Sequence, residues 1–295
     1  MSAEILDGRL LAEQIREQLK KEIHAFRGET GSVPHVVNVV LGGDVGSEFY
    51  AKSQAKAAGD IGIVYERIAL ATGTSEKKLL EHLQQLNQDP RITGIIINKP
   101  LPAHINEQKV ANALSLEKDI EGLNAANIGN IVLGKAKVIP CTAAAVMEHV
   151  KASGINLRGK EVVVVGASAI VGKPLALLFV QQYATVTLCH IGTSEAGRLK
   201  DHVARADVLV VAVGKAHLIT GEMIKEGAVV IDVGINKKGD KIVGDVDYDS
   251  VARRALKISP VPGGVGPVTV MMLMRNAVLR SEEHTSELQS RTVIS

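Results

Sequence analysis

The sequence contains few aromatic residues and no tryptophan, which limits how its core can be built. Phe, Tyr and Trp together make up 2% of the 295 residues. A core without large rings has to be filled by Val, Ile, Leu and Ala, and continuous aliphatic runs are typical of buried parallel strands. The composition therefore favours an α/β fold.

Cysteine is also scarce, and this bears on compartment and on metal binding. The chain has two cysteines, Cys141 and Cys189, and no CxxC pair. A disulfide framework or a cysteine-based zinc site requires more thiols at closer spacing. We therefore expect a reducing, cytoplasmic environment and no bound metal.

Neither the charge nor the hydrophobic pattern indicates nucleic acid or a membrane as partner. Lys and Arg number 34 against 32 Asp and Glu, for a net charge of +2. Nucleic-acid and anionic-membrane surfaces usually carry a clear basic excess. No segment approaches the length of a membrane span, and the first residues lack a signal-peptide pattern.

Short aliphatic runs alternate with amphipathic segments along the whole chain, which is long enough for two domains. Such alternation predicts mainly parallel sheets with right-handed crossovers. The expected strands are 36–41, 64–70, 93–98, 161–165, 185–189, 208–213 and 228–233. The expected helices are 8–26, 47–58, 75–87, 142–153 and 268–279, with shorter ones beginning near 106 and 172.

The segment 161–174, EVVVVGASAIVGKP, has the pattern of a phosphate-binding loop. A strand ends at Gly166 and a helix begins at Gly172, so backbone N–H groups could approach an anion closely. The spacing is not GxGxxG, and the next strand ends in Cys189 and His190 instead of an acidic residue for a ribose hydroxyl. On this pattern alone, nucleotide binding and simple packing glycines are equally good interpretations.

Four segments together carry a resemblance to one protein family. They are SEFYAKSQAKAAGDIGI (47–63), VVVVGASAIVGKPLALL (162–178), VIDVGIN (230–236) with VGDVDY (243–248), and SPVPGGVGPVTV (259–270). They resemble the bifunctional methylenetetrahydrofolate dehydrogenase/methenyltetrahydrofolate cyclohydrolase (FolD-type) family, over residues 3–279. The unusual composition of SPVPGGVGP makes a chance match a poor explanation.

The resemblance implies a fold and a reaction. It implies an α/β folate-binding domain at 1–140, completed by helix 268–279, a Rossmann-type NAD(P)-binding domain at 141–267, and a cleft between them. Members transfer a hydride from 5,10-methylenetetrahydrofolate to a nicotinamide cofactor, and in most of them water then attacks the methenyl product. The resemblance also suggests a homodimer.

The folate-side residues implied by the resemblance depart from the family pattern. The implied catalytic positions are Tyr50, Gln54, Asn98 and Glu121, and the implied substrate-binding positions are Tyr50, Pro100, Leu101, Glu121, Pro262, Gly263, Gly264 and Pro267. The family has a lysine one helical turn after the tyrosine, whereas this chain has Gln54, which is neither a general base nor a cation. QLPLP becomes NKPLP (98–102), KDVDG becomes KDIEG (118–122), and PCTPxG becomes PCTAAA (140–145).

The implied cofactor residues depart from the pattern too. They are Gly166, Ala167, Ser168, Ile170, Val171, Gly172, His190, Ile191, Gly214 and Ile235. Members that use NADP usually have arginine and serine where this chain has Ala167 and Ile191, so a 2′-phosphate lacks its bidentate partner. This favours NAD, with NADP the alternative if Lys173, Arg198 or Lys200 compensates.

Three functions follow from these departures. The first is a methylenetetrahydrofolate dehydrogenase with little or no cyclohydrolase activity, because Gln54 replaces the lysine. The second retains both activities, and the third is a catalytically silent folate- or nucleotide-binding homologue. A dehydrogenase of amino or hydroxy acids would leave SPVPGGVGP unexplained.

Two further expectations concern polar residues without a catalytic role and the C-terminal tail. Asp232 and Asp245 have the pattern of loop and turn carboxylates without a chemical role, and His190 that of a local hydrogen-bonding residue. At the C-terminus, RSEEHTSELQS (280–290) resembles the in-frame translation of a common sequencing adapter. We therefore expect 280–295 to be a non-native tail and the native helix to end near Leu279.

Overall fold

The computed structural model describes residues 2–42 and 45–293, which form two compact units. Unit 1 comprises Met1–Glu13 and Pro140–Thr269, and unit 2 comprises Gln14–Ile139 and Val270–Ser295. Within the described ranges, no helix combines the length and the apolar character needed to cross a membrane.

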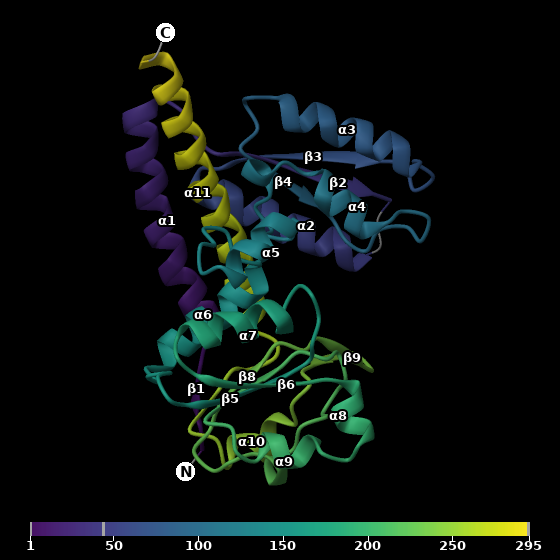
Figure 1. Cartoon of the computed structure of the whole chain (residues 1–295), viewed down its shortest axis with the longest axis vertical. Coiled ribbons are helices and arrows are strands. Elements are labelled where there is room, and N and C mark those ends of the chain that lie inside the picture. Colours follow the sequence, from purple (N-terminus) through teal and green to yellow (C-terminus); the bar gives the residue numbers. More distant parts are fainter. Residues whose placement is uncertain (1, 43–44, 294–295) are drawn as a thin grey trace. The chain divides into compact units, whose positions relative to one another are not determined.

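Unit 1 is built on a six-stranded, entirely parallel sheet (Figure 1). Its strand order is β1-β11-β8-β7-β5-β6. The strands are β1 (Glu4–Ile5), β5 (Glu161–Val165), β6 (Thr185–Cys189), β7 (Val208–Val211), β8 (Val229–Asp232) and β11 (Lys257–Ile258). The three central strands consist almost wholly of buried Val, Ile and Leu, because helices cover both faces.

The helices of unit 1 lie on both faces of this sheet, with α6 and α7 on one face and α9 and α10 on the other (Figure 1). They are α6 (Cys141–Ser153), α7 (Gly172–Gln181), α8 (Ile191–Glu195), α9 (Leu199–Val203) and α10 (Tyr248–Ala252). The chain leaves β5 toward β6 on one side, while β7 pairs on the other side of β5. The carboxyl ends of β5 and β7 therefore flank the topological switch point, where doubly wound sheets bind ligands.

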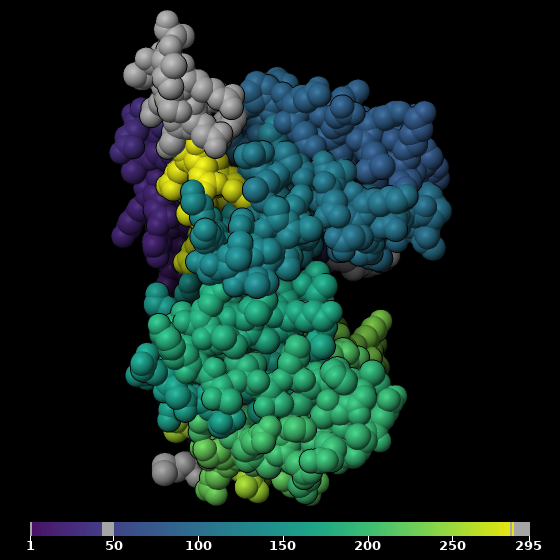
Figure 2. All heavy atoms as spheres, viewed as in Figure 1, coloured from purple at the N-terminus to yellow at the C-terminus, as the bar shows by residue number. Residues whose placement is uncertain are grey.

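A two-stranded hairpin of β9 (Asn236–Lys238) and β10 (Lys241–Val243) follows β8. It is exposed along most of its length and projects from the body of unit 1 (Figure 2). The hairpin returns the chain to Asp245, next to the end of the sheet.

Unit 2 contains a three-stranded parallel sheet in the order β3-β2-β4. Its strands are β2 (His35–Leu41), β3 (Val64–Leu70) and β4 (Gly94–Ile97). Its helices are α2 (Val45–Ile61), α3 (Glu76–Gln88), α4 (Glu107–Ala113) and α5 (Ala125–Val132), with a 3-10 turn at Leu116–Lys118. Leu79 and Leu83 of α3 pack with Val37, Val39 and Ile95 into one aliphatic core.

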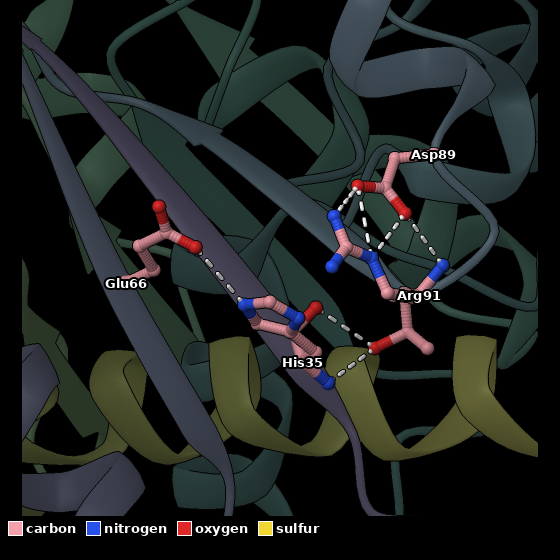
Figure 3. A network of polar contacts seen from close by, with 5 residues as sticks. His35, Glu66, Asp89 and Arg91 are labelled. Carbon is pink, nitrogen blue, oxygen red and sulfur yellow. Dashed lines mark hydrogen bonds and ion pairs between the residues drawn. The ribbon is translucent and has the colours of Figure 1, made fainter.

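Polar contacts fix the amino-terminal edge of this sheet (Figure 3). The His35 imidazole faces the Glu66 carboxylate with 3.3 Å between Nε2 and Oε2, and the Thr93 hydroxyl accepts the His35 N–H at 2.8 Å. Beside them, Arg91 forms a 2.6 Å ion pair with Asp89, which lowers the pKa of that carboxyl. The opposite, carboxyl-terminal edge of the sheet carries the candidate site.

Two long helices, α1 (Gly8–Thr30) and α11 (Val265–Val293), begin in unit 1 and continue in unit 2, where they lie side by side (Figure 1). Ile15, Leu19 and Ile23 of α1 are buried at helical spacing. Burial, and then repulsion from Glu22 and Glu29 of α1, raises the pKa of Glu282 on α11.

The predicted α/β fold class is confirmed, and strands 64–70, 161–165 and 185–189 have the predicted bounds. Several short elements were not predicted: β1, β11, the β9–β10 hairpin, α5 and α8 to α10. Most of them have five residues or fewer, too few to show a hydrophobic period.

The first thirteen residues differ from the predicted domain of 1–140, because they belong to unit 1. The N–H groups of Ala3, Glu4 and Leu6 donate to the carbonyls of residues 252, 256 and 258 at 2.8–2.9 Å. These bonds add β1 to the sheet edge beside β11, a pairing across the whole chain that no local pattern reveals.

The final helix also differs from the prediction, because α11 continues past Leu279 to Val293. Residues 280–293 contain neither glycine nor proline, so nothing in them interrupts a helix. Arg280 is buried, and its Nη2 donates to Asn127 Oδ1 at 3.1 Å, while its Nη1 lies 2.6 Å from Glu283 Oε2. The foreign origin of residues 280–295 stays a prediction.

Replacing Arg280 by alanine is expected to lower the free energy of unfolding by about 1–3 kcal/mol, because the buried Asn127 amide oxygen loses its donor. Denaturant titration measures the change. Lys77→Ala, which removes an exposed 3.9 Å ion pair with Glu81, serves as control, with an expected change below about 0.5 kcal/mol. Equal effects of the two variants would contradict a buried Arg280 contact.

Candidate functional sites in the two units

In unit 2, the predicted residues Tyr50 and Gln54 lie one turn apart on α2 but in different environments. Tyr50 is 39% exposed, whereas Gln54 is 2% exposed. The Gln54 side-chain carbonyl accepts hydrogen bonds from Asn38 Nδ2 at 3.2 Å and from the Tyr65 hydroxyl at 2.9 Å. Asn38 Nδ2 also contacts Tyr65 Oη at 2.6 Å, which closes a three-residue network between β2, α2 and β3.

This network is uncharged; its two amide side chains are buried and Tyr65 is half-buried. Burial raises the pKa of Tyr65 to about 12, so its hydroxyl keeps its proton at neutral pH. The amide oxygen of Asn38 is buried and has no hydrogen-bond partner among the described residues. Neither Asn38 nor Tyr65 was predicted as a site residue. The available signal was a buried-strand pattern, HVVNVVL, interrupted by one asparagine.

Glu121 lies in a pocket at the carboxyl end of β4. Its neighbours there include Ile97, Lys99, Leu101 and Asp119. Glu121 Oε2 accepts the Ile97 N–H at 3.4 Å. Burial, reinforced by Asp119, raises the pKa of Glu121 to about 7, against the opposing effects of that hydrogen bond and of Lys99. A carboxyl group that titrates near neutral pH is suited to proton exchange.

The loop that carries Glu121 is held rigidly by its neighbours. The Asp119 carboxylate accepts three hydrogen bonds, from the N–H groups of Gly122 and Asn124 and from Asn127 Nδ2, at 2.7–2.9 Å. Lys118 Nζ donates to the Leu86 and Asp89 carbonyls at 2.9 and 2.6 Å, near the C-terminus of α3. These contacts fix the backbone on both sides of Glu121. The segment KDIEG (118–122) therefore holds the loop in shape as well as carrying the catalytic candidate.

The other predicted folate-side residues of unit 2 follow β4. Asn98 is largely buried, and its N–H donates to the Val39 carbonyl at 2.9 Å. The Lys99–Pro100 peptide bond is cis, and Lys99 Nζ lies 3.1 Å from Glu107 Oε2. The structure therefore places Leu101 and Glu121 in one pocket, with Asn98 and Pro100 on the connecting backbone.

The predicted residues Pro262, Gly263, Gly264 and Pro267 belong to unit 1. The Gly263 carbonyl accepts the Gly8 N–H at 2.9 Å, and a Cβ on Gly264 would collide with the Pro260 carbonyl. Gly264 also accepts a hydrogen bond from the buried His149, whose pKa is lowered chiefly by burial. Glycine is required here by close backbone packing, and Pro267 lies in the first turn of α11.

The predicted phosphate-binding loop of unit 1 is a tight turn between β5 and α7. Gly166 has φ +118°, where a Cβ would meet the Ala212 carbonyl, and a Cβ on Gly172 would meet the Gly166 carbonyl. The Ser168 hydroxyl accepts the Val171 N–H at 3.2 Å, just before α7 begins. The N–H groups of residues 167–170 donate to no described residue, so they fit the pyrophosphate of a dinucleotide.

The remaining predicted cofactor residues include exposed apolar side chains in the loops that follow β6 and β8. Ile191 is 74% exposed and Ile235 is 67% exposed, and Ala167 carries no polar side chain. His190 caps the short helix α8, since its Nδ1 accepts the Gly192 N–H at 3.2 Å. Arg198, a candidate for compensating charge, faces Asp201 at 3.5 Å.

Asp232 and Asp245 differ from the loop residues expected from sequence, because both are buried and hydrogen-bonded to backbone. Asp232 accepts the N–H groups of Gly234, Asp245 and Val246 at 2.9–3.0 Å. Burial nevertheless raises the pKa of Asp232 to about 6. In the part of the chain that the structure describes, no three His, Cys, Asp or Glu side chains are grouped to hold a metal ion.

The fold and these sites define an α/β protein with a Rossmann-type nucleotide-binding unit and a second α/β unit that has its own pocket. Residues 6–121 match the model of the tetrahydrofolate dehydrogenase/cyclohydrolase catalytic domain. Residues 140–285 match the model of the NAD(P)-binding domain of the same family. The chain belongs to the tetrahydrofolate dehydrogenase/cyclohydrolase family, as the sequence motifs predicted.

Individual relatives are similar over nearly the whole chain. The bifunctional protein FolD of Moorella thermoacetica is 47% identical over 279 residues, which cover 94% of this chain and 98% of the relative. The crystal structure of the FolD dehydrogenase/cyclohydrolase of Campylobacter jejuni has a TM-score of 0.92 at 37% identity and covers 96% and 99% of the two chains. The Trypanosoma brucei enzyme, complexed with NADP and an inhibitor, has a TM-score of 0.91 at 34% identity and covers 96% and 98%.

Glu121 is expected to make stability depend on pH. Its folded-state pKa lies above the unfolded value, so its contribution is fully present below about pH 4.5 and is lost as the pH rises through 7. Between pH 5 and 8, the free energy of unfolding of the wild type should therefore fall by about 1–2 kcal/mol relative to that of Glu121→Gln. This value is reduced for the partial exposure of the Glu121 side chain. Denaturant titrations at several pH values measure this.

The control is Glu81→Gln, which alters an exposed carboxylate of α3. Its pH profile should stay parallel to that of the wild type. Parallel profiles for wild type and Glu121→Gln would contradict the raised pKa of Glu121.

Proposed function

We propose that the chain is a nicotinamide-dependent 5,10-methylenetetrahydrofolate dehydrogenase of one-carbon metabolism that hydrolyses the methenyl product poorly or not at all. The observation that carries the proposal is the buried network of Asn38, Gln54 and Tyr65. It occupies the position at which the family pattern has a lysine, and it contains no group that changes charge near neutral pH.

The dehydrogenase half needs orientation more than acid–base chemistry. A bound nicotinamide supplies the hydride acceptor, and the protein holds the two rings at reacting distance. The N–H groups of residues 167–170 are suited to the pyrophosphate, and Glu121 in its ionised form is suited to the amino and ring N–H donors of a pterin. Both sets of groups are present, which supports hydride transfer.

The cyclohydrolase half needs a group that moves a proton from the attacking water. The Gln54 carbonyl already accepts two hydrogen bonds, and an amide does not take up a proton in this range. Tyr65 is too weak an acid, because burial raises its pKa to about 12. We therefore expect the network to help shape the substrate site but not to activate the attacking water.

A bifunctional enzyme is the second candidate, and Glu121 is the observation that favours it. Its pKa of about 7 would let this carboxyl take up and release a proton at neutral pH. The relatives from Moorella thermoacetica and Campylobacter jejuni are described as bifunctional. A silent binding protein is the remaining outcome, identified by ligand binding without turnover.

For the cofactor we propose NAD in preference to NADP. Ala167 and the exposed Ile191 supply no charge or hydrogen bond to a 2′-phosphate, and Arg198 already faces Asp201. The NADP complex of the Trypanosoma brucei enzyme makes NADP the alternative. The family resemblance further suggests a cytoplasmic homodimer acting on a tetrahydrofolate derivative.

Purified protein with 5,10-methylenetetrahydrofolate and NAD is expected to form NADH while the methenyl product accumulates. Absorbance of the methenyl form and of the reduced cofactor follows the two species separately. Gln54→Lys is expected to speed methenyl decay by about tenfold or more over the buffer rate, since a positioned acid–base group typically contributes at least this much. The buried Asn38 oxygen offers the new ammonium an acceptor.

Ser53→Lys is the matched control, because it adds the same charge one residue away on the exposed side of α2. It should leave methenyl decay unchanged. Rapid decay in the wild type would establish the bifunctional alternative instead, and binding without NADH or NADPH formation would establish the silent one.

The double variant Ala167→Arg/Ile191→Ser is expected to improve kcat/KM for NADP by about tenfold or more, because a guanidinium can bind the 2′-phosphate in bidentate fashion. The value for NAD should change little. Val180→Arg, an exposed position near the end of α7, adds the same charge away from the loop and should shift neither cofactor. A wild type that already prefers NADP would contradict the proposed cofactor.

A further inference from the structure

The carboxylate of Asp245 is the centre of an anion-binding arrangement built mainly from backbone N–H groups. Its side chain is 0% exposed. It accepts the N–H groups of three consecutive residues, Val213 at 2.7 Å, Gly214 at 3.0 Å and Lys215 at 2.8 Å. Successive N–H groups that converge on one anion form a nest, and here the anion is internal.

A fourth hydrogen bond connects this carboxylate to a different loop. Asn236 Nδ2 donates to Asp245 Oδ1 at 2.9 Å. Asn236 opens the hairpin after β8, whereas residues 213–215 follow β7. Asp245 therefore joins the two loops that leave neighbouring strands at the carboxyl edge of the sheet.

Asp245 is held in place on every side. A Cβ on Gly234 would collide with its carboxylate, so only glycine is accommodated there. Its own N–H donates to Asp232 Oδ1 at 3.0 Å, and its carbonyl accepts the Ile219 N–H at 3.2 Å. Neither the side chain nor the backbone of Asp245 can move without breaking contacts with both loops.

These two loops contain residues that the sequence assigned to the cofactor. Gly214 lies in the nest with φ +67°, and Ile235 directly precedes Asn236. The preceding residue, Ala212, packs its carbonyl against Gly166 of the phosphate-binding loop at the switch point. The loops joined by Asp245 thus lie beside the phosphate-binding loop at the carboxyl end of the sheet, where doubly wound folds bind their ligands.

We propose that Asp245 is the positioning residue of the cofactor site, an inference that rests on the proposed nicotinamide-dependent function. Its carboxylate occupies the nest that the N–H groups of 213–215 form, so those groups do not bind the cofactor's phosphates. Because N–H and C=O of a trans peptide point in opposite directions, the Val213 and Gly214 carbonyls face away from Asp245. They are oriented to accept hydrogen bonds from donors of the cofactor.

The test compares Asp245→Asn with Asp207→Asn in the full-length protein. Asp207 is a matched carboxylate just before β7, at the opposite end of the same strand, where it accepts the Glu161 N–H at 3.0 Å and pairs with Lys225 at 2.6 Å. Asp245→Asn should raise the KM and the dissociation constant for NAD by about tenfold or more, since it removes charge-assisted bonds to three N–H groups. KM for the folate should change less than about twofold, as expected when only cofactor contacts are perturbed.

Hydrogen exchange of the peptide that contains residues 213–215 provides a readout that needs no ligand. Exchange should be faster in Asp245→Asn and unchanged in Asp207→Asn. If Asp245→Asn does not fold, Asn236→Leu serves instead, because it removes the hydrogen bond from Asn236 Nδ2 to Asp245 Oδ1. This variant should also raise the dissociation constant for NAD.

The outcomes separate this inference from the proposed function. A wild type that binds no nicotinamide cofactor overturns the proposed function and with it the cofactor role of Asp245. A wild type that binds NAD, with affinity and 213–215 exchange unchanged in Asp245→Asn, overturns only the inference. Equal loss of NAD affinity in Asp207→Asn would likewise overturn it, by showing that any damage to β7 has this effect.

Discussion

Buried carboxylates saturated by backbone N–H groups hold the functional loops of both units in shape. A loop at the end of a parallel strand has few hydrogen-bond partners of its own, and a buried N–H without a partner is costly. Asp119 meets this need around Glu121, and Asp245 meets it between the loops after β7 and β8. In both cases one carboxylate accepts the N–H groups that would otherwise pair in the hydrogen-bond ladder of the sheet. The predicted ligand-binding residues lie on the loop backbone that this carboxylate fixes.

The acidic side chains of the two sites differ in how many hydrogen-bond donors surround them. Asp119 and Asp245 accept three and four hydrogen bonds and hold their loops in place. Glu121 accepts one long bond, so burial dominates and its pKa rises to about 7. This difference supports the proposal that Glu121 exchanges protons, while Asp119, two residues earlier, holds the loop in place.

The network of Asn38, Gln54 and Tyr65 shows how the fold accommodates an amide at the position where the family has a lysine. An isolated amide in place of a lysine would leave buried polar atoms without partners, whereas here the Gln54 carbonyl has two donors from neighbouring strands. The position is therefore occupied by an organised, uncharged group. The proposal of a dehydrogenase with little hydrolase activity rests on this arrangement, because hydride transfer needs orientation whereas hydrolysis needs a proton acceptor.

The sequence by itself determined the α/β class, the long helices and central strands, the family, and the loops that carry Gly166, Glu121 and Gly264, because these depend on periodicity and on local backbone demands. Only the tertiary structure decided the partners of Gln54, the pKa of Glu121, the pairing of β1 with β11, the continuation of α11 and the role of Asp245. Each of these depends on contacts between residues far apart in the chain: Asp245 meets residues 213–215 about thirty positions away, and β1 meets β11 across more than 250. Burial and hydrogen-bond satisfaction are properties of those contacts, so no local pattern contains them.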